Sequence, residues 1–199
     1  EKLDELSGAL SGCGFDGIAE NQDLLMKCFT GFILGKRSPS DMMELTGEQI
    51  RDNFEKIKNG LKSSIDFFKN ELHLYSLSYV PYPAMMVSLV RFFGTDRMSG
   101  RLYSDKQRHQ LIKWFWKSCF SRRYSSGVND AHQTDLNAMS KLREDEETDI
   151  SPFKCDISDN FFTDNQFNIN SVDTKTFIAL LASKNPRSFI SGGKVDLAV

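Results

Sequence analysis

The sequence predicts an all-α protein, folded as an irregular bundle of about six or seven helices with a short extended connector near residues 74–82. Three observations support this fold class. Apolar residues recur at helical intervals along most of the chain, capping motifs stand at the start of two such segments, and no pair of long alternating stretches suggests a sheet. With 199 residues, 40% of them hydrophobic, the chain can bury a substantial core.

Two long helices are expected in the first part of the chain. Residues 20–35 carry an apolar stripe at helical spacing, and Gly35 follows it as a helix stop. The second helix begins at the capping box 46–49 and places seven apolar residues on one face: Ile50, Phe54, Ile57, Leu61, Ile65, Phe68 and Leu72. Because Gly60 inside this helix costs about 1 kcal/mol relative to alanine, we expect a closely packed partner to compensate.

The hydrophobic pattern changes in the middle of the chain. Residues 74–79 alternate with period two, and Pro81 and Pro83 favour extended backbone before each ring, so this segment is the predicted connector. A short apolar helix is expected over 84–93, ending at Gly94, with Pro83 suited to its first turn. Residues 94–101 are expected to form an exposed loop.

The next predicted helix begins at a second capping box, 104–107, and runs to about Phe120. Its two faces differ in character. Leu111, Ile112, Phe115, Trp116 and Cys119 share an apolar face, while Lys106, Lys113 and Lys117 lie on the opposite side. The run Trp114-Phe115-Trp116 could stack unpaired bases, but a core role is favoured, with only Trp114 near enough to the boundary to project outward.

The last third is predicted to hold two more helices. Residues 129–143 form a weaker helix through Leu136, Met139 and Leu142, followed by a solvated acidic loop and, over 150–170, by no sustained period. The final helix starts near Ser171, with Phe177, Ile178, Leu180 and Leu181 on its buried side, and ends at Asn185-Pro186. Ser191-Gly192-Gly193-Lys194 lacks the spacing of a phosphate loop and predicts a Gly-rich turn.

Charge is unevenly distributed although the formal net charge is only -2. Residues 97–123 hold eight cations and one acid, a net +7, whereas 144–164 hold eight acids and one lysine, a net -7. The two segments could pair inside the fold, or the basic segment could face DNA phosphates, and the spacing does not choose between them. An ordinary solvated or internally paired face is favoured over a phosphate-facing one, because surface charge runs are common and individually weak. The candidate phosphate contacts are Lys106, Lys113, Lys117, Arg122 and Arg123, although the last two also suit a helix C-terminus by their charge alone.

No catalytic, metal or cofactor site is predicted. The three histidines fall on separate elements, the four cysteines are far apart without a Cys-x-x-Cys pair, and adjacent carboxylates in a loop seldom hold a metal. The cysteines are therefore expected to be reduced thiols, and no apolar stretch is long enough to cross a bilayer. Because the chain opens without a methionine or a signal region, we expect a cytoplasmic piece of a larger protein.

Three segments, taken in order, resemble a known family. They are Val80-Pro81-Tyr82-Pro83, then 111–118 with Ser121-Arg122-Arg123-Tyr124-Ser125, then 177–182 leading into 185–192. Together they resemble the middle of GmrSD-like proteins, which are related to type IV, modification-dependent restriction endonucleases. Such proteins join a ParB/sulfiredoxin-like nucleotide-hydrolysing domain, through a helical region, to an HNH nuclease domain. The resemblance covers about residues 70–195.

The resemblance implies a non-enzymatic role for this stretch. Neither the Asp-Gly-Gln-Gln-Arg motif of the first domain nor the His-His-Ile-Phe-Pro run of the nuclease occurs in the sequence. The resemblance therefore implies a helical connector. Whether residues 1–199 form one helical domain or two lobes, 1–95 and 100–199, stays open from the sequence. The partners of the connector would be the two flanking domains of the same chain, with DNA as a further candidate.

Two other functions remain open. The chain could be a stand-alone helical interaction module that binds a protein in a groove beside the Pro81–Phe93 segment. It could also be a small metal-dependent hydrolase that uses the acidic run, which would require divalent-ion binding. The sequence does not distinguish which modified base or nucleotide a parent protein would use, nor whether the chain dimerises.

Overall fold

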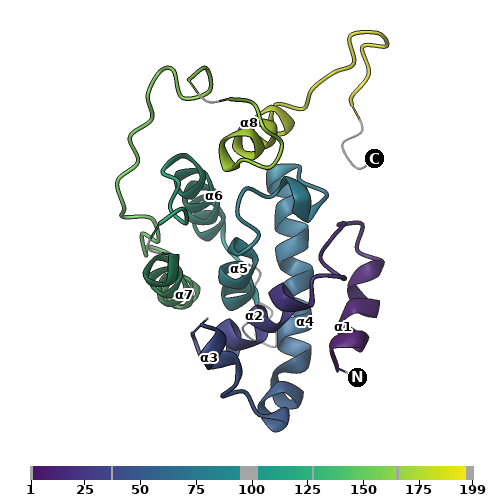
Figure 1. Ribbon diagram of the computed structural model, residues 1–199, viewed down its shortest axis with the longest axis vertical. Coiled ribbons are helices and arrows are strands. Elements are labelled where there is room, and N and C mark those ends of the chain that lie inside the picture. The colour runs from purple at the N-terminus through teal and green to yellow at the C-terminus, as the bar shows by residue number, and fades with distance from the viewer. Residues whose placement is uncertain (1, 37, 95–102, 127, 165, 196–199) are drawn as a thin grey trace.

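A computed structural model describes residues 2–36, 38–94, 103–126, 128–164 and 166–195. Over these residues the chain is all-α, as predicted, with two isolated β-bridges and no strand (Figure 1). Eight α-helices and one 3-10 turn are found there, slightly more than expected: α1 (Lys2–Ser11), α2 (Gln22–Ile33), α3 (Pro39–Met42), α4 (Gly47–Leu72), η1 (Leu77–Tyr79), α5 (Met85–Phe93), α6 (Asp105–Phe120), α7 (Val128–Glu144) and α8 (Val172–Ser183).

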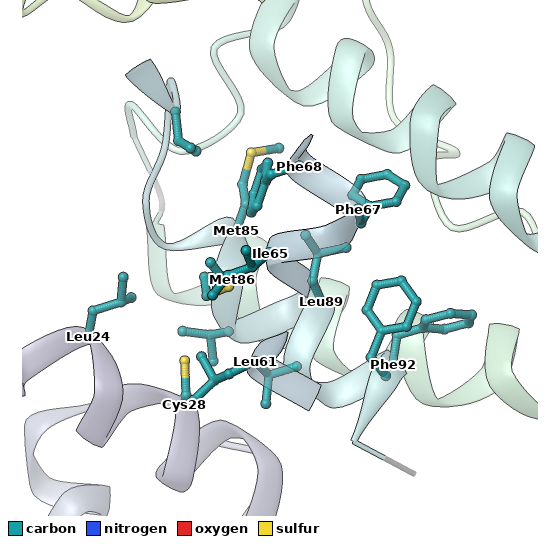
Figure 2. Close-up of a cluster of buried hydrophobic side chains, with 14 of the residues drawn as sticks. Leu24, Cys28, Leu61, Ile65, Phe67, Phe68, Met85, Met86, Leu89 and Phe92 are labelled. Carbon is teal, nitrogen blue, oxygen red and sulfur yellow. The ribbon is translucent and has the colours of Figure 1, made fainter. Parts of the chain in front are cut away.

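Helices α4 and α5 form the centre of the molecule. Eight of the nine residues of α5 are buried, and α5 packs against α4, α2 and α7. Figure 2 shows the interior between these helices, where side chains from α2, α4 and α5 meet. One continuous cluster of buried side chains includes residues from both halves of the chain, from Leu6 in α1 to Ala179 in α8.

Glycine permits the closest approach between α4 and α5. A Cβ added to Gly60 would lie 3.0 Å from the Cα of Gly94, which is closer than real Cβ atoms normally approach. The expected compensation for a glycine inside α4 is therefore backbone contact with the end of α5. Gly31 on α2 likewise permits close approach to α5, because a Cβ there would lie 2.4 Å from the side-chain atom Cγ1 of Val87.

Both predicted capping boxes are confirmed. Thr46 accepts a hydrogen bond from the backbone N–H of Gln49, and the Gln49 side chain accepts one from the backbone N–H of Thr46. Ser104 and Gln107 make the same reciprocal pair at the start of α6. Each cap satisfies N–H groups that the first helical turn leaves without partners.

Three short elements were not predicted. Helix α1 buries Leu6 and Leu10, and α3 is a single turn that Ser38 caps together with Asp41. The connector near 74–82 contains the turn η1, and Asp16 pairs with Ser76 beside it, so the connector is only partly extended. Most of the expected loop over 94–101 lies outside the described residues.

The buried face of α8 was predicted wrongly. Its buried residues are Thr174, Thr176, Ala179 and Ala182, whereas Leu181 is 49% exposed and Phe177, Ile178 and Leu180 are only partly buried. Helix α8 is apolar on more than one side, so its periodicity does not select a face. Small side chains suit the close contact of α8 with α6 and α4.

Two further expectations concern cysteines and membranes. Cys13, Cys28, Cys119 and Cys155 all lie among the described residues, and no disulfide joins them. Within the described part of the chain, every helix is too short or too polar to cross a membrane.

Candidate functional site

The basic face of α6 lies against the acidic segment, which we define as residues 144–164. Lys106 forms an ion pair with Glu147, and Lys113 Nζ lies 3.2 Å from Asp149 Oδ1. Lys117 donates a 2.7 Å hydrogen bond to the backbone carbonyl of Ser151. We call these three lysines the α6 cation row. They bind every second residue of the acidic segment, from Glu147 to Ser151, along the length of α6.

Electrostatics and local hydrogen bonds reinforce this contact. The hydrogen bond and charge of Glu147 raise the pKa of Lys106. The backbone N–H of Ser151 lowers the pKa of Asp149, and Lys113 lowers it further. Both shifts favour the charged forms that attract one another.

The first turn of α6 also binds the end of α7. The side-chain amide of Gln107 donates a 2.8 Å hydrogen bond to the buried backbone carbonyl of Leu142, and Ser104 Oγ donates one of 3.0 Å to Glu146. The capping residues thus satisfy a carbonyl that the last turn of α7 leaves without a helical partner. The cap therefore fixes where the acidic segment begins relative to α6.

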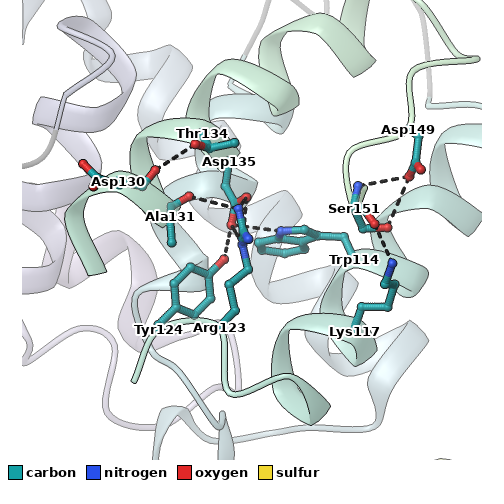
Figure 3. Close-up of polar contacts among 10 residues, drawn as sticks. All are labelled: Trp114, Lys117, Arg123, Tyr124, Asp130, Ala131, Thr134, Asp135, Asp149 and Ser151. Carbon is teal, nitrogen blue, oxygen red and sulfur yellow. Dashed lines mark hydrogen bonds and ion pairs between the residues drawn. The ribbon is translucent and has the colours of Figure 1, made fainter. Parts of the chain in front are cut away.

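A buried carboxylate, Asp135 of α7, joins the other end of α6. Its side chain is fully buried and accepts hydrogen bonds from Trp114 Nε1 at 3.2 Å and from Arg123 Nη2 at 2.7 Å (Figure 3). The hydroxyl of Tyr124 also donates to it. A buried charge is tolerated when it is paired and hydrogen-bonded, as it is here. We call Asp135 and its three donors the Asp135 cluster.

The cluster is enclosed by aromatic rings. The His132 ring stacks on Tyr124, with centroids 4.1 Å apart and planes within 4°. The guanidinium carbon of Arg123 lies 3.9 Å from the centre of the Phe153 ring, and Lys117 approaches the same ring. Burial raises the pKa of Tyr124 well above its ordinary value, and the nearby charge of Asp135 raises it further. Tyr124 is therefore a neutral hydrogen-bond donor.

Arg122 connects α6 to α8. It adopts a left-handed backbone conformation with φ of 51° and forms two hydrogen bonds with Asp173, Nε to Oδ1 at 3.0 Å and Nη2 to Oδ2 at 2.8 Å. The hydrogen bonds from Arg122 to Asp173 raise the pKa of Arg122. Such fork-shaped pairs fix orientation as well as charge.

The five cations predicted to contact phosphate are therefore all bound to acceptors within the chain. All five lie on α6 or the turn that follows it, and each binds a carboxylate or carbonyl oxygen of the same chain. The three lysines contact the acidic segment, one of the two arrangements that the charge pattern allowed, whereas Arg122 and Arg123 pair with Asp173 and Asp135 outside that segment.

Sequence reasoning missed the Asp135 cluster. Trp114, the ring of this run that lay near enough to the boundary to project outward, is fully buried, because Asp135 supplies a partner for its indole N–H inside the fold. The sequence signal was present: Asp135 stands seven residues before Leu142, which places the carboxylate on the buried face of α7. Phe115 is buried and Trp116 half-buried, as the core interpretation requires.

An open cavity of about 480 Å³ lies beside the C-terminal end of α6. Both cations that line it form ion pairs within the chain, since Arg122 binds Asp173 and Lys154 Nζ lies 2.8 Å from Asp156. Its lining mixes two cations, two acids, serines and aromatic rings: Phe120, Ser121, Arg122, Lys154, Asp156, Ser158, Phe161 and Asp164. Among the residues that the structure places, no group of three or more His, Cys, Asp or Glu is arranged to hold a metal ion.

Comparisons with known proteins identify no relative of the chain. No protein-family model, no curated protein and no solved structure matches the chain. The resemblance to GmrSD-like proteins therefore depends on the three sequence segments alone.

Proposed function

We propose that the chain is a non-catalytic helical connector of a GmrSD-like DNA-defence protein of the bacterial cytoplasm. It would hold a nucleotide-hydrolysing domain and an HNH nuclease domain in a fixed relation, without a cofactor of its own. The family named in this proposal comes from the resemblance of residues 70–195. The internal contacts of α6 support the role of a connector.

The observation that carries the proposal is the engagement of the α6 charges. The α6 cation row, Arg122 and Arg123 bind acceptors of the same chain, and these acceptors lie on α7, on α8 and on the segment between them. Side chains with these contacts position other elements, whereas a catalytic or phosphate-binding group must be able to exchange its partner for a substrate. A connector needs the first property, because rigid packing transmits relative position between domains.

Phosphate contact by the five cations stays a prediction. Each of them would have to exchange an internal acceptor for a DNA phosphate, and Arg123 would leave the buried Asp135 carboxylate without its ion pair. Lys106 and Lys113 are exposed and each forms one ion pair, so they are the more favourable place for such an exchange, whereas Lys117 is half-buried and also lies over the Phe153 ring.

The alternative of an interaction groove beside Pro81–Phe93 is not favoured. Residues of α5 face neighbours on all sides and lie in the core rather than along an open groove. The stand-alone interaction module would therefore need another surface.

The direct test of the connector is an assay of the purified chain for catalysis. The chain is incubated with magnesium, each of the common nucleoside triphosphates, and plasmid DNA with and without modified bases. We expect neither phosphate release nor nicked DNA above a buffer blank. Turnover that persists through purification and disappears on denaturation would contradict the proposal.

A further inference from the structure

Residues 186–195, beyond α8, fold back on themselves as a small arm with one isolated bridge. Ser188 N–H donates to the Gly193 carbonyl at 2.9 Å, Val195 N–H donates to the Pro186 carbonyl at 3.0 Å, and Arg187 pairs with Lys194 as an antiparallel bridge. The arm projects away from the helical body at the yellow end of the chain (Figure 1). We call residues 186–195 the arm.

The tip of the arm is held by hydrogen bonds. The Ser188 hydroxyl accepts the N–H groups of Ile190 and Ser191, both at 3.2 Å, and Gly192 takes a left-handed conformation with φ of 66°. This arrangement presents Phe189 and Ile190 outward, 108% and 99% exposed relative to the residue maximum. An ordered turn that exposes two large apolar side chains side by side is typical of a binding surface.

The charge of the arm differs from that of α6. The arm contains two cations, Arg187 and Lys194, and no acid, and a third cation, Lys184, precedes it at the C-terminal end of α8. Within the described chain none of these three forms an ion pair, whereas the α6 cations are engaged. Arg187 uses one guanidinium nitrogen to donate to the Gly192 carbonyl, which leaves its other donors for a ligand. The arm is therefore complementary to a polyanion.

We propose that the arm binds duplex DNA in the minor groove, with Arg187 and Lys194 against phosphates and Phe189 and Ile190 wedged at a base step. Minor-groove proteins combine cations with apolar side chains that partly unstack a step and bend the duplex. The small residues beside the tip, Ser191, Gly192 and Gly193, allow the backbone to approach a groove about 6 Å wide. This inference rests on the DNA-defence role proposed above, which favours DNA over an anionic membrane as the polyanion.

The experiment uses the whole chain and a fluorescent AT-rich duplex of about 30 base pairs. Binding is followed by anisotropy at several salt concentrations, and bending by energy transfer between dyes at the two ends of the duplex. Replacing Lys184, Arg187 and Lys194 by glutamine should weaken binding. It should also reduce the salt slope, which is the steepness of the logarithm of the binding constant plotted against the logarithm of the salt concentration, by about 0.9 for each phosphate that the variant no longer neutralises. Replacing Phe189 and Ile190 by serine should abolish the bend and leave the salt slope unchanged.

Two matched variants serve as controls. Lys141→Gln removes an exposed cation of α7, and Met43→Ser removes a side chain that is 88% exposed elsewhere on the molecule. Both should bind and bend DNA as the unaltered chain does. Because the arm projects from the body, the circular dichroism of all variants should stay that of the parent.

Three outcomes would overturn the inference: DNA binding that the arm variants do not change, a duplex that stays straight when the unaltered chain binds, or arm-dependent binding to phosphatidylglycerol vesicles without binding to DNA. The connector proposal fails by a different result, turnover by the purified chain. A failure of either proposal is therefore recognised independently of the other.

Discussion

At the scale of single residues, Asp135 is the most constrained charge in the described part of the molecule. Its carboxylate is fully buried, and Trp114, Arg123 and Tyr124 all donate to it. Removing one partner of a buried pair leaves the other charge uncompensated, which costs more than the pair itself contributes. The cluster therefore determines how α7 and the C-terminal end of α6 fit together.

Substitution of this carboxylate should be strongly destabilising. Asp135→Asn keeps the volume but leaves the guanidinium of Arg123 without its ion pair, so we expect the free energy of unfolding to fall by about 3 kcal/mol. Urea denaturation measures the loss. Asp52→Asn, at an exposed position on α4, is the control and should change stability by less than about 0.5 kcal/mol. Equal stability of the two variants would mean that the buried pair contributes little.

The raised pKa of Tyr124 predicts a loss of stability in alkali. The folded chain keeps this phenol neutral, while the unfolded chain releases its proton near the ordinary pKa of 10.0. Above that pH the unfolded state binds fewer protons than the folded state, so the free energy of unfolding decreases as pH rises. Burial also raises the pKa of Tyr82 and Tyr103, which contribute in the same direction.

Tyr124→Phe isolates the contribution of this phenol. The variant should be less stable than the parent at neutral pH, because Asp135 loses a donor, but its stability should fall less steeply above about pH 10. Urea unfolding at about pH 8 and about pH 11 supplies the comparison. The same steepness in both proteins would show that Tyr124 titrates normally in the fold.

At the scale of helices, local sequence signals predicted where elements begin and end. The capping boxes at Thr46 and Ser104 and the glycine stop after α2 depend on neighbouring residues, so the sequence reveals them directly. The face that a helix buries depends on distant partners. The buried face of α8 was therefore misjudged, because contact with α6 and α4 selects its small side chains. The burial of Trp114 likewise depends on a carboxylate 21 residues away, which accepts a hydrogen bond from its indole N–H.

Close helix packing predicts opposite effects for two glycines. Gly60→Ala should destabilise the protein by about 1–3 kcal/mol, because the new methyl group meets the backbone of Gly94, although alanine is the better helix former. Gly8→Ala, in α1, has nothing within 4 Å of its added Cβ and should stabilise by up to about 1 kcal/mol. Thermal unfolding compares both with the parent. A gain in stability at Gly60 would contradict the packing of α4 on α5.

At the scale of the whole molecule, part of the uneven charge is neutralised inside the fold, because Lys106 and Lys113 form ion pairs with Glu147 and Asp149. The sequence predicted the all-α class and identified the basic and acidic segments, but it allowed either internal pairing or DNA contact. That choice depends on the path of residues 144–171, which lack helical periodicity and so give no local signal of where they lie. In the structure their first part follows α6, while the cations of the arm have no ion pair among the described residues.

Amide hydrogen exchange in the acidic segment tests most directly whether the α6 cation row is structural. The amides of Asp145, Glu147, Thr148 and Ser151 donate hydrogen bonds at the start of this segment. With all three lysines of the row replaced by glutamine, these amides should exchange several-fold faster, while amides of α4 stay as protected as in the parent and in Lys141→Gln. Unchanged protection of the segment, together with weaker DNA binding by the triple variant, would contradict the structural role and favour phosphate contact by α6.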